Sequence, residues 1–126
     1  MARTRRPRRV LLVEDNKAAR CALQTLLELE GYDVDTAENG RAGLQHLRTN
    51  VAPFVIVLDL QMPVMGGVAF RHAQLADRQL RRIPVVVCSG APLDGVKKQL
   101  RATAYFRKPL DIDAFLSAIH RLARSR

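Results

Sequence analysis

The chain has 126 residues, of which 48% are hydrophobic and 26% are charged, and its formal net charge is +9. This length fits one domain with a sizeable core. No apolar stretch approaches the roughly 20 residues that span a bilayer, and the apolar run near the N-terminus is too short for a signal peptide. These features exclude a membrane-spanning protein and favour a globular domain with no membrane partner.

The N-terminal residues 1–8 form a basic arm, and residues 9–126 are assigned to the folded domain. Five arginines lie within the first nine residues and account for more than half of the net charge. Such a run can contact phosphate groups. We interpret it instead as a solvated, disordered tail, because the arm contains no element that recognises nucleic-acid bases. A basic net charge affects solubility and association with partners, and it carries no information about the fold.

The two cysteines indicate the compartment. Cys21 and Cys88 have neither metal-ligand nor Cys-x-x-Cys spacing. We therefore predict two buried free thiols in a reducing environment and expect a cytoplasmic protein.

Five short apolar segments are typical of buried β-strands, because they are rich in β-branched residues and bounded by turn residues. They are residues 10–13, 32–37, 54–58, 85–88 and 104–106. The second segment alternates in polarity, which indicates a strand with one exposed face.

Segments with apolar residues at helical spacing lie between and after these strands. Helices are predicted from a cap at Asp15 or Asn16 to Gly31, from Asn39 to about residue 51, over 68–77, over 94–100, and from Asp111 onward. The predicted inward-facing residues are Ala19, Leu23, Leu26, Leu27, Ala42, Leu44, Leu47, Val51, Ile112, Phe115, Ile119 and Leu122. Residues 78–82 read as a polar connection. Strand and helix alternate five times, which predicts a doubly wound (βα)5 α/β sandwich around a five-stranded parallel sheet.

Polar side chains follow four of the predicted strands. Glu14 and Asp15 follow the first, Asp59 the third, Ser89 the fourth and Lys108 the fifth. The carboxyl ends of parallel strands share one edge, where ligands bind in such folds, so we expect these groups to converge. Three carboxylates supply the hard oxygen ligands that suit Mg²⁺. With the cation in place Asp59 could attack phosphorus as a nucleophile, while Lys108 and Ser89 bind phosphoryl oxygens.

Each of these positions alone has a simpler explanation. An acid after a strand is usually a helix cap or a turn residue, and a Ser-Gly pair is an ordinary turn. We favour a shared site over separate turn and cap residues because all of these groups follow strands. Parallel pairing would bring the acids, the hydroxyl and the ammonium together at one end of the sheet.

On these residues the chain resembles the receiver domain of two-component response regulators, the CheY-like group of flavodoxin-like folds. The resemblance runs from Arg9 to Leu122. Its most specific elements are the pair Glu14-Asp15, the turn Asp59-x-x-Met62-Pro63-x-Met65-x-Gly67, Ser89, and Tyr105-x-x-Lys108-Pro109. It implies the strand order 2-1-3-4-5.

The resemblance also implies roles for individual residues. Asp59 would accept a phosphoryl group from the phosphohistidine of a histidine kinase or phosphotransfer protein, and Lys108 would be the charge partner of that group. Ser89 would be the switch hydroxyl, and Tyr105 the aromatic side chain whose rotamer follows it. The ligands of Mg²⁺ would be Glu14, Asp15, Asp59 and the backbone carbonyl of Gln61.

The sequence departs from the family around the fourth helix. Arg101-Ala102 stands where Gly-Ala is common, and a left-handed helix cap costs more without glycine. The segment 89–108 is about one helical turn short and contains Pro92 and Gly95. We therefore expect a stunted fourth helix and unchanged phosphorylation chemistry.

Other functions fit less well. A hydrolase of the aspartyl-phosphate type needs a second acid two residues after Asp59, and Gln61 stands there. A nucleotide-binding domain needs a phosphate loop after the first strand, where Glu14 and Asp15 repel phosphate. A nucleic-acid binder would show a base-reading element, so nucleic acid is an unexpected partner.

We expect a signalling domain that catalyses only its own phosphotransfer and slow dephosphorylation. It would act on a downstream protein or on an output domain, because the chain ends at Arg126 directly after the last predicted helix. The sequence is compatible with a stand-alone regulator and with one domain of a longer protein. In either case the domain could form a homodimer.

Overall fold

One parallel sheet organises the fold, with its five strands in the order β2-β1-β3-β4-β5. The computed structural model of the protein describes residues 8–125. The predicted doubly wound architecture and strand order are confirmed. The strands are β1 (Arg9–Val13), β2 (Asp33–Ala37), β3 (Val55–Asp59), β4 (Val85–Ser89) and β5 (Ala104–Arg107).

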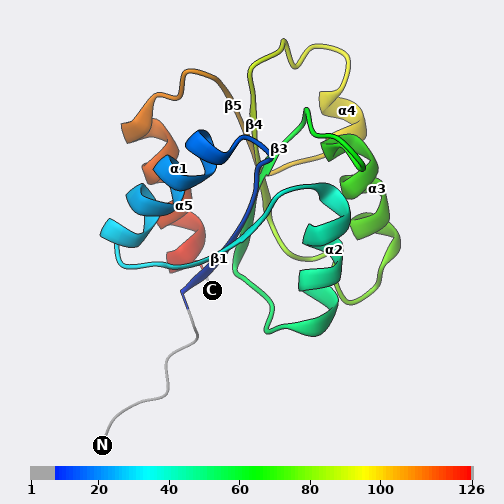
Figure 1. Cartoon of the computed structure of the whole chain (residues 1–126), viewed down its shortest axis with the longest axis horizontal. Helices are drawn as coiled ribbons and strands as arrows, with labels where there is room; N and C mark the ends of the chain where they lie inside the picture. The colour runs from blue at the N-terminus through cyan, green and yellow to red at the C-terminus, as the bar shows by residue number, and fades with distance from the viewer. Residues whose placement is uncertain (1–7, 126) are drawn as a thin grey trace, which may run out of the picture.

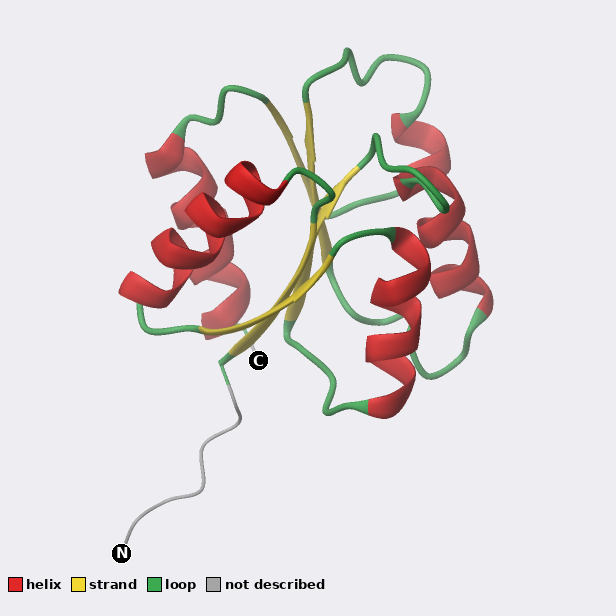
Figure 2. Cartoon of the chain, viewed as in Figure 1, coloured by secondary structure: helices red, strands yellow, loops and turns green. Residues whose placement is uncertain are grey.

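The helices form one layer on each side of the sheet (Figures 1 and 2). Helices α1 (Lys17–Leu29) and α5 (Ile112–Arg124) cover one face, and α2 (Gly40–Thr49), α3 (Gly67–Ala76) and α4 (Lys97–Leu100) cover the other. The predicted helix over 94–100 is present only as the four residues of α4. Its first part is a turn in which Gly95 has a positive φ of 84°, so the expected stunted helix is confirmed.

Alternate side chains of the strands point into two separate hydrophobic layers. On the α2–α3–α4 side, Leu11, Ile56 and Val85 pack around Phe70 of α3, whereas Val10 and Val57 face α1 and α5. Phe70 is fully buried, as is Phe115 of α5 on the opposite face, and each ring contributes about 3–5 kcal/mol relative to alanine. The central strands are therefore buried on both faces, which explains their unbroken apolar sequences.

Three helices begin with the capping residues that the sequence indicates. The side chains of Asn16, Asn39 and Asp111 each accept a hydrogen bond from the backbone N–H three residues later. Each bond satisfies one of the N–H groups that a helix start leaves free, which is worth about 1 kcal/mol. Of the two candidates for the first cap, the structure selects Asn16.

Three predictions about burial are wrong, and a connection predicted to be polar contains a buried residue. Val51 is 62% exposed, since α2 ends before it and helical spacing no longer applies. Ile112 is 42% exposed because it starts α5 beyond the part that packs on the sheet. Cys21 is exposed on the outer side of α1, unlike the buried Cys88. Leu80, in the predicted polar connection, is buried.

The predicted basic arm, residues 1–8, lies outside the described residues except for Arg8. The Arg8 guanidinium lies 4.5 Å from the centre of the Tyr32 ring, a cation–π contact at the start of β2. Among the described residues, no helix is both long and apolar enough to cross a membrane.

Candidate functional site

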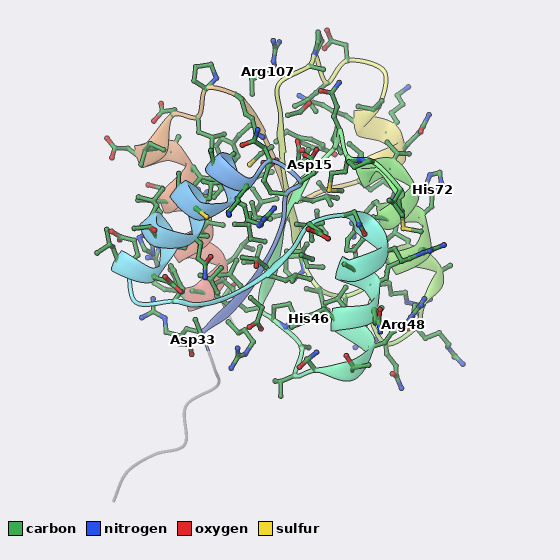
Figure 3. All side chains as sticks on the ribbon, in the orientation of Figure 1. Asp15, Asp33, His46, Arg48, His72 and Arg107 are labelled. Atoms are coloured by element: carbon green, nitrogen blue, oxygen red, sulfur yellow. The ribbon has the colours of Figure 1, made fainter. Side chains whose placement is uncertain are left out.

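Three carboxylates meet where β1 and β3 end, which is the point where the strand order reverses. Glu14 and Asp15 directly follow β1 and Asp59 is the last residue of β3. One oxygen from each lies within 4.8 Å of the others. Glu14 and Asp59 are buried, while Asp15 is exposed at the upper end of the sheet (Figure 3). The predicted convergence of the acids is therefore present.

Lys108 brings the positive charge of the site. Its Nζ donates a 2.7 Å hydrogen bond to Glu14 Oε1 and lies 3.6 Å from Asp59 Oδ1. The Lys108 backbone N–H bonds to the carbonyl of Ser89, which fixes the residue beside the end of β4. The ammonium therefore bridges two of the three acids, and its shorter contact is with Glu14 instead of Asp59.

Burial and charge oppose each other in this cluster. Burial, and secondarily the charge of Glu14, raise the pKa of Asp59 to about 6, although Lys108 acts to lower it. Burial alone would lower the pKa of Lys108, but its hydrogen bond to Glu14 and the charge of Asp59 outweigh burial and raise the pKa above its ordinary value. Lys108 thus pairs with two of the three acids, and a divalent cation would neutralise the negative charge that it leaves unbalanced.

The oxygen donors fit Mg²⁺ in chemistry and in spacing. Hard carboxylate oxygens gathered at one end of the sheet, with Asp15 open to solvent, suit a cation that keeps several water ligands. The carbonyl of Gln61 follows Asp59 by two residues, and its part in binding stays a prediction.

The Ser89 hydroxyl lies one position beyond the β3–β4 pair formed by Asp59 and Cys88. The side chain is buried and exchanges hydrogen bonds of 3.1 Å with the backbone N–H and C=O of Ala91. Ser89 is therefore the residue after the strand partner of Asp59, but its hydroxyl is hydrogen-bonded to the loop that follows β4.

Tyr105 points away from the acids, toward α4. Its hydroxyl donates to the Lys97 carbonyl at 3.0 Å and accepts from the Ala102 N–H at 2.8 Å. The Lys97 ammonium lies 5.1 Å from the ring centre. The predicted switch aromatic is thus bonded to the first residue of α4 and to the residue after its C-cap, and it makes no hydrogen bond with the carboxylates in this structure.

The loop after Asp59 depends on close backbone approach. A Cβ on Gly67 would lie 2.7 Å from Leu60 Cα, so only glycine fits where α3 begins.

The same loop contains a strained residue, Val64. Its φ is positive, at 69°, and it is 72% exposed, a strained state for a β-branched residue.

Arg20 is a member of the site that sequence reasoning missed. Its NH1 donates to the backbone carbonyls of Glu14 and Asp15 at 3.0 and 3.2 Å. These bonds hold the segment that carries both acids. No signal marks Arg20 in the sequence, because an arginine on an exposed helix surface is ordinary.

Fold and site together define the class of protein: a doubly wound α/β domain with an acidic, oxygen-rich centre at its topological switch point. Residues 10–120 match the model of the response regulator receiver domain. The chain belongs to this family, whose members act in two-component signalling.

Two relatives agree with the assignment, and a third protein shares the fold. The polar-differentiation response regulator DivK of Brucella anthropi is 29% identical over 116 residues, covering 90% of this chain and 94% of that protein. The receiver domain of a signal transduction histidine kinase from Syntrophus aciditrophicus is 29% identical with a TM-score of 0.84, covering 93% and 90%. The response regulator TrrA of Thermotoga maritima, solved in complex with Mg²⁺-BeF, has a TM-score of 0.79 at 24% identity and covers 91% and 98%.

Proposed function

We propose that this receiver domain accepts a phosphoryl group onto Asp59 in the presence of Mg²⁺ and thereby changes a surface that binds another protein. The observation that carries the proposal is the convergence of Glu14, Asp15, Asp59 and Lys108 at one edge of the sheet. The donor would be the phosphohistidine of a histidine kinase or of a phosphotransfer protein.

The transfer needs an ionised nucleophile and a place for the incoming charge. A carboxylate oxygen of Asp59 forms the new bond to phosphorus as the P–N bond of the donor breaks, and the imidazole leaves with the electron pair. With a pKa of about 6, Asp59 is still mainly ionised at neutral pH. Mg²⁺, held by Glu14, Asp15, Asp59 and the Gln61 carbonyl, would neutralise negative charge on the phosphoryl group. Lys108 would move from Glu14 to a phosphoryl oxygen.

The switch would begin at Ser89. A phosphoryl group adds a charge of about −1.5 to −2 and three strong acceptor oxygens. The Ser89 hydroxyl would leave Ala91 to bind one of them and draw the following loop inward, and Tyr105 would turn from Lys97 into the space released. The altered surface would consist of α4, β5 and α5.

The domain would act on itself and not on a small-molecule substrate, catalysing phosphotransfer and slow loss of its own phosphoryl group. Its partners would be the phosphodonor protein and a downstream protein or output domain. A homodimer would be an alternative way to use the altered surface.

The test is labelling with a small phosphodonor, such as acetyl phosphate with Mg²⁺, followed by intact mass spectrometry. We expect one phosphoryl group on the wild type and on Asp33→Asn, a surface acid at the opposite end of the sheet (Figure 3), and none on Asp59→Asn. Full labelling of Asp59→Asn would remove that residue from its role.

A Mg²⁺ titration followed by amide NMR shifts tests the metal site separately. We expect Asp15→Ala to weaken Mg²⁺ binding by about tenfold or more, because the variant loses one of three charged ligands. The same affinity in Asp15→Ala and wild type would contradict the assignment.

A further inference from the structure

Helix α3 contains a buried cation, Arg71, that the phosphorylation site does not use. The residue is 6% exposed, and among the described residues it forms no ion pair with a carboxylate. Its Nε donates to the Leu100 carbonyl at 2.7 Å and its NH2 to the Arg101 carbonyl at 2.8 Å. The C-terminal end of α4 thus supplies the acceptors for this charge.

Gln74, one turn further along α3, holds Arg71 in place. Its side-chain Oε1 accepts a 2.7 Å bond from Arg71 NH1. Its Nε2 donates to the carbonyls of Leu80 and Ile83 in the connection that leads into β4. Gln74 is fully buried, and the two side chains form a polar bracket that joins α3, α4 and the start of β4.

Helix α4 depends on contacts from outside itself. It has four residues, and its N-cap residue, Val96, makes no side-chain capping bond. The residue that ends it, Arg101, has a left-handed backbone with φ 48° where glycine is preferred. A helix this short has no stability of its own, so outside contacts determine where it lies: the fully buried side chain of Leu100 packs in the core, and Arg71 and Tyr105 supply hydrogen bonds.

These two supports differ in strength. Arg71 is buried, and breaking its bonds would leave a charge and the Leu100 carbonyl without hydrogen bonds in the interior. Tyr105 is only half-buried, so water can replace its bonds to Lys97 and Ala102. In the loop before α4, a Cβ at Gly90 or Gly95 would meet nothing within 4 Å, which leaves that loop room to move.

We propose that Arg71 is a positioning residue that anchors the C-terminal end of α4 to α3. Within the altered surface, the backbone movement is then largest in residues 90–96 and at Tyr105, while the C-terminal end of α4 at Leu100 and Arg101 remains attached to α3. The switching half of this inference rests on the proposed function, whereas the anchor is a property of the unphosphorylated domain.

The experiment follows backbone amides and the Arg71 Nε–H by NMR, with and without Mg²⁺ and beryllium fluoride as a phosphoryl mimic. We expect resonances of residues 90–96 and Tyr105 to shift, while the Arg71 Nε–H keeps its position and slow hydrogen exchange. Loss of that protection, or shifts at Leu100 and Arg101 as large as those in 90–96, would overturn the inference.

Variants test the anchor directly. Arg71→Met should accelerate amide exchange at Gln99, Leu100 and Arg101 by at least about tenfold and leave exchange in β1 and β3 unchanged. It should still bind beryllium fluoride, with shifts now spreading through α4. Arg78→Met, at an exposed arginine after α3, should behave as wild type.

The outcomes separate the two proposals. If Arg71→Met fails to fold, Arg71→Lys, which keeps the charge but fewer donors, should show the same selective acceleration. Unchanged exchange in α4 of the folded variant overturns the anchor. Absence of any wild-type response to beryllium fluoride overturns the proposed function and the switching half of the inference, and leaves the exchange test of the anchor standing.

Discussion

Two cations, the buried Arg71 and the partly buried Lys108, stabilise two different kinds of region. Lys108 lies at the rigid end of the sheet and is surrounded by carboxylates. Arg71 lies under α4 and is surrounded only by carbonyl oxygens. Lys108 needs to exchange one hydrogen bond, that to Glu14, to reach a new anion, whereas Arg71 cannot move without breaking hydrogen bonds from three of its nitrogens.

This difference suggests a division of labour. The site is built at the ends of paired strands, where the backbone is held by the sheet and small displacements are costly. Between β4 and β5, residues 90–103 contain one helix of four residues, and such weakly held segments are where conformational change concentrates. Phosphorylation would take place at the strand ends, which the sheet holds in position. The resulting change in conformation would occur in the segment between β4 and β5.

The largest expected effect is at Asp59, in buffer without Mg²⁺. Its pKa of about 6 in the folded protein lies above the ordinary 3.8, so ionisation costs more in the folded than in the unfolded state. The resulting penalty is absent below pH 3.8, grows between pH 3.8 and 6, and is complete above pH 6. Asp59→Asn should therefore stabilise the protein by up to about 3 kcal/mol at pH 8.

Urea unfolding of wild type and Asp59→Asn across pH 4–8 measures this gain. Asp33→Asn is the matched control and should show no such trend, and saturating Mg²⁺ should reduce the difference. A gain that is equally large at pH 4 would mean that burial of the Asp59 charge is not its source.

Replacing Lys108, the cation of the site, should destabilise the protein, whereas Asp59→Asn should stabilise it. Lys108→Met leaves the buried Glu14 without its 2.7 Å partner, and we expect a loss of about 2 kcal/mol at pH 7, reduced because the ammonium is partly exposed. The loss should shrink in the Asp59→Asn background, where one fewer acid needs neutralising. Additive losses in a double-mutant cycle of urea unfolding would show that the two groups do not interact.

Backbone strain allows a matched comparison of the two regions. Val64 in the site loop and Arg101 after α4 are the non-glycine residues with positive φ in the part of the chain that is described. Val64→Gly and Arg101→Gly should each stabilise the fold by about 0.5–1 kcal/mol, because relief of the left-handed strain exceeds the added chain entropy. Arg107→Gly, in β5, should destabilise by a similar amount, and thermal unfolding of the three variants ranks them.

The smallest expected effect is that of the basic arm. The family match begins at residue 10, and no site residue lies before Glu14. Deleting residues 1–7 should leave labelling by a small phosphodonor unchanged and shift stability by less than about 0.5 kcal/mol. A severalfold change in labelling rate would assign the arm a part in the reaction.

Most of the site residues could be predicted from the sequence, because the end of a strand can be recognised from a few neighbouring residues. The acids at 14, 15 and 59 and Lys108 each follow an apolar strand, and parallel pairing alone brings such positions together. The weak fourth helix could also be predicted, since Arg101 replaces glycine there. The Arg71–Gln74 bracket could not, because a polar residue in an amphipathic helix is read as surface unless its burial is known.

What the sequence determined by itself was the alternation of strand and helix, the caps at Asn39 and Asp111, and the family. All of these depend on neighbours within a few residues, where backbone preference and hydrophobic period decide. Three further features depend on how the elements pack: Lys108 bonds first to Glu14, Tyr105 is bonded to α4, and Arg71 is buried. These contacts join residues distant in the chain, and packing of whole elements, not local preference, sets which polar groups meet.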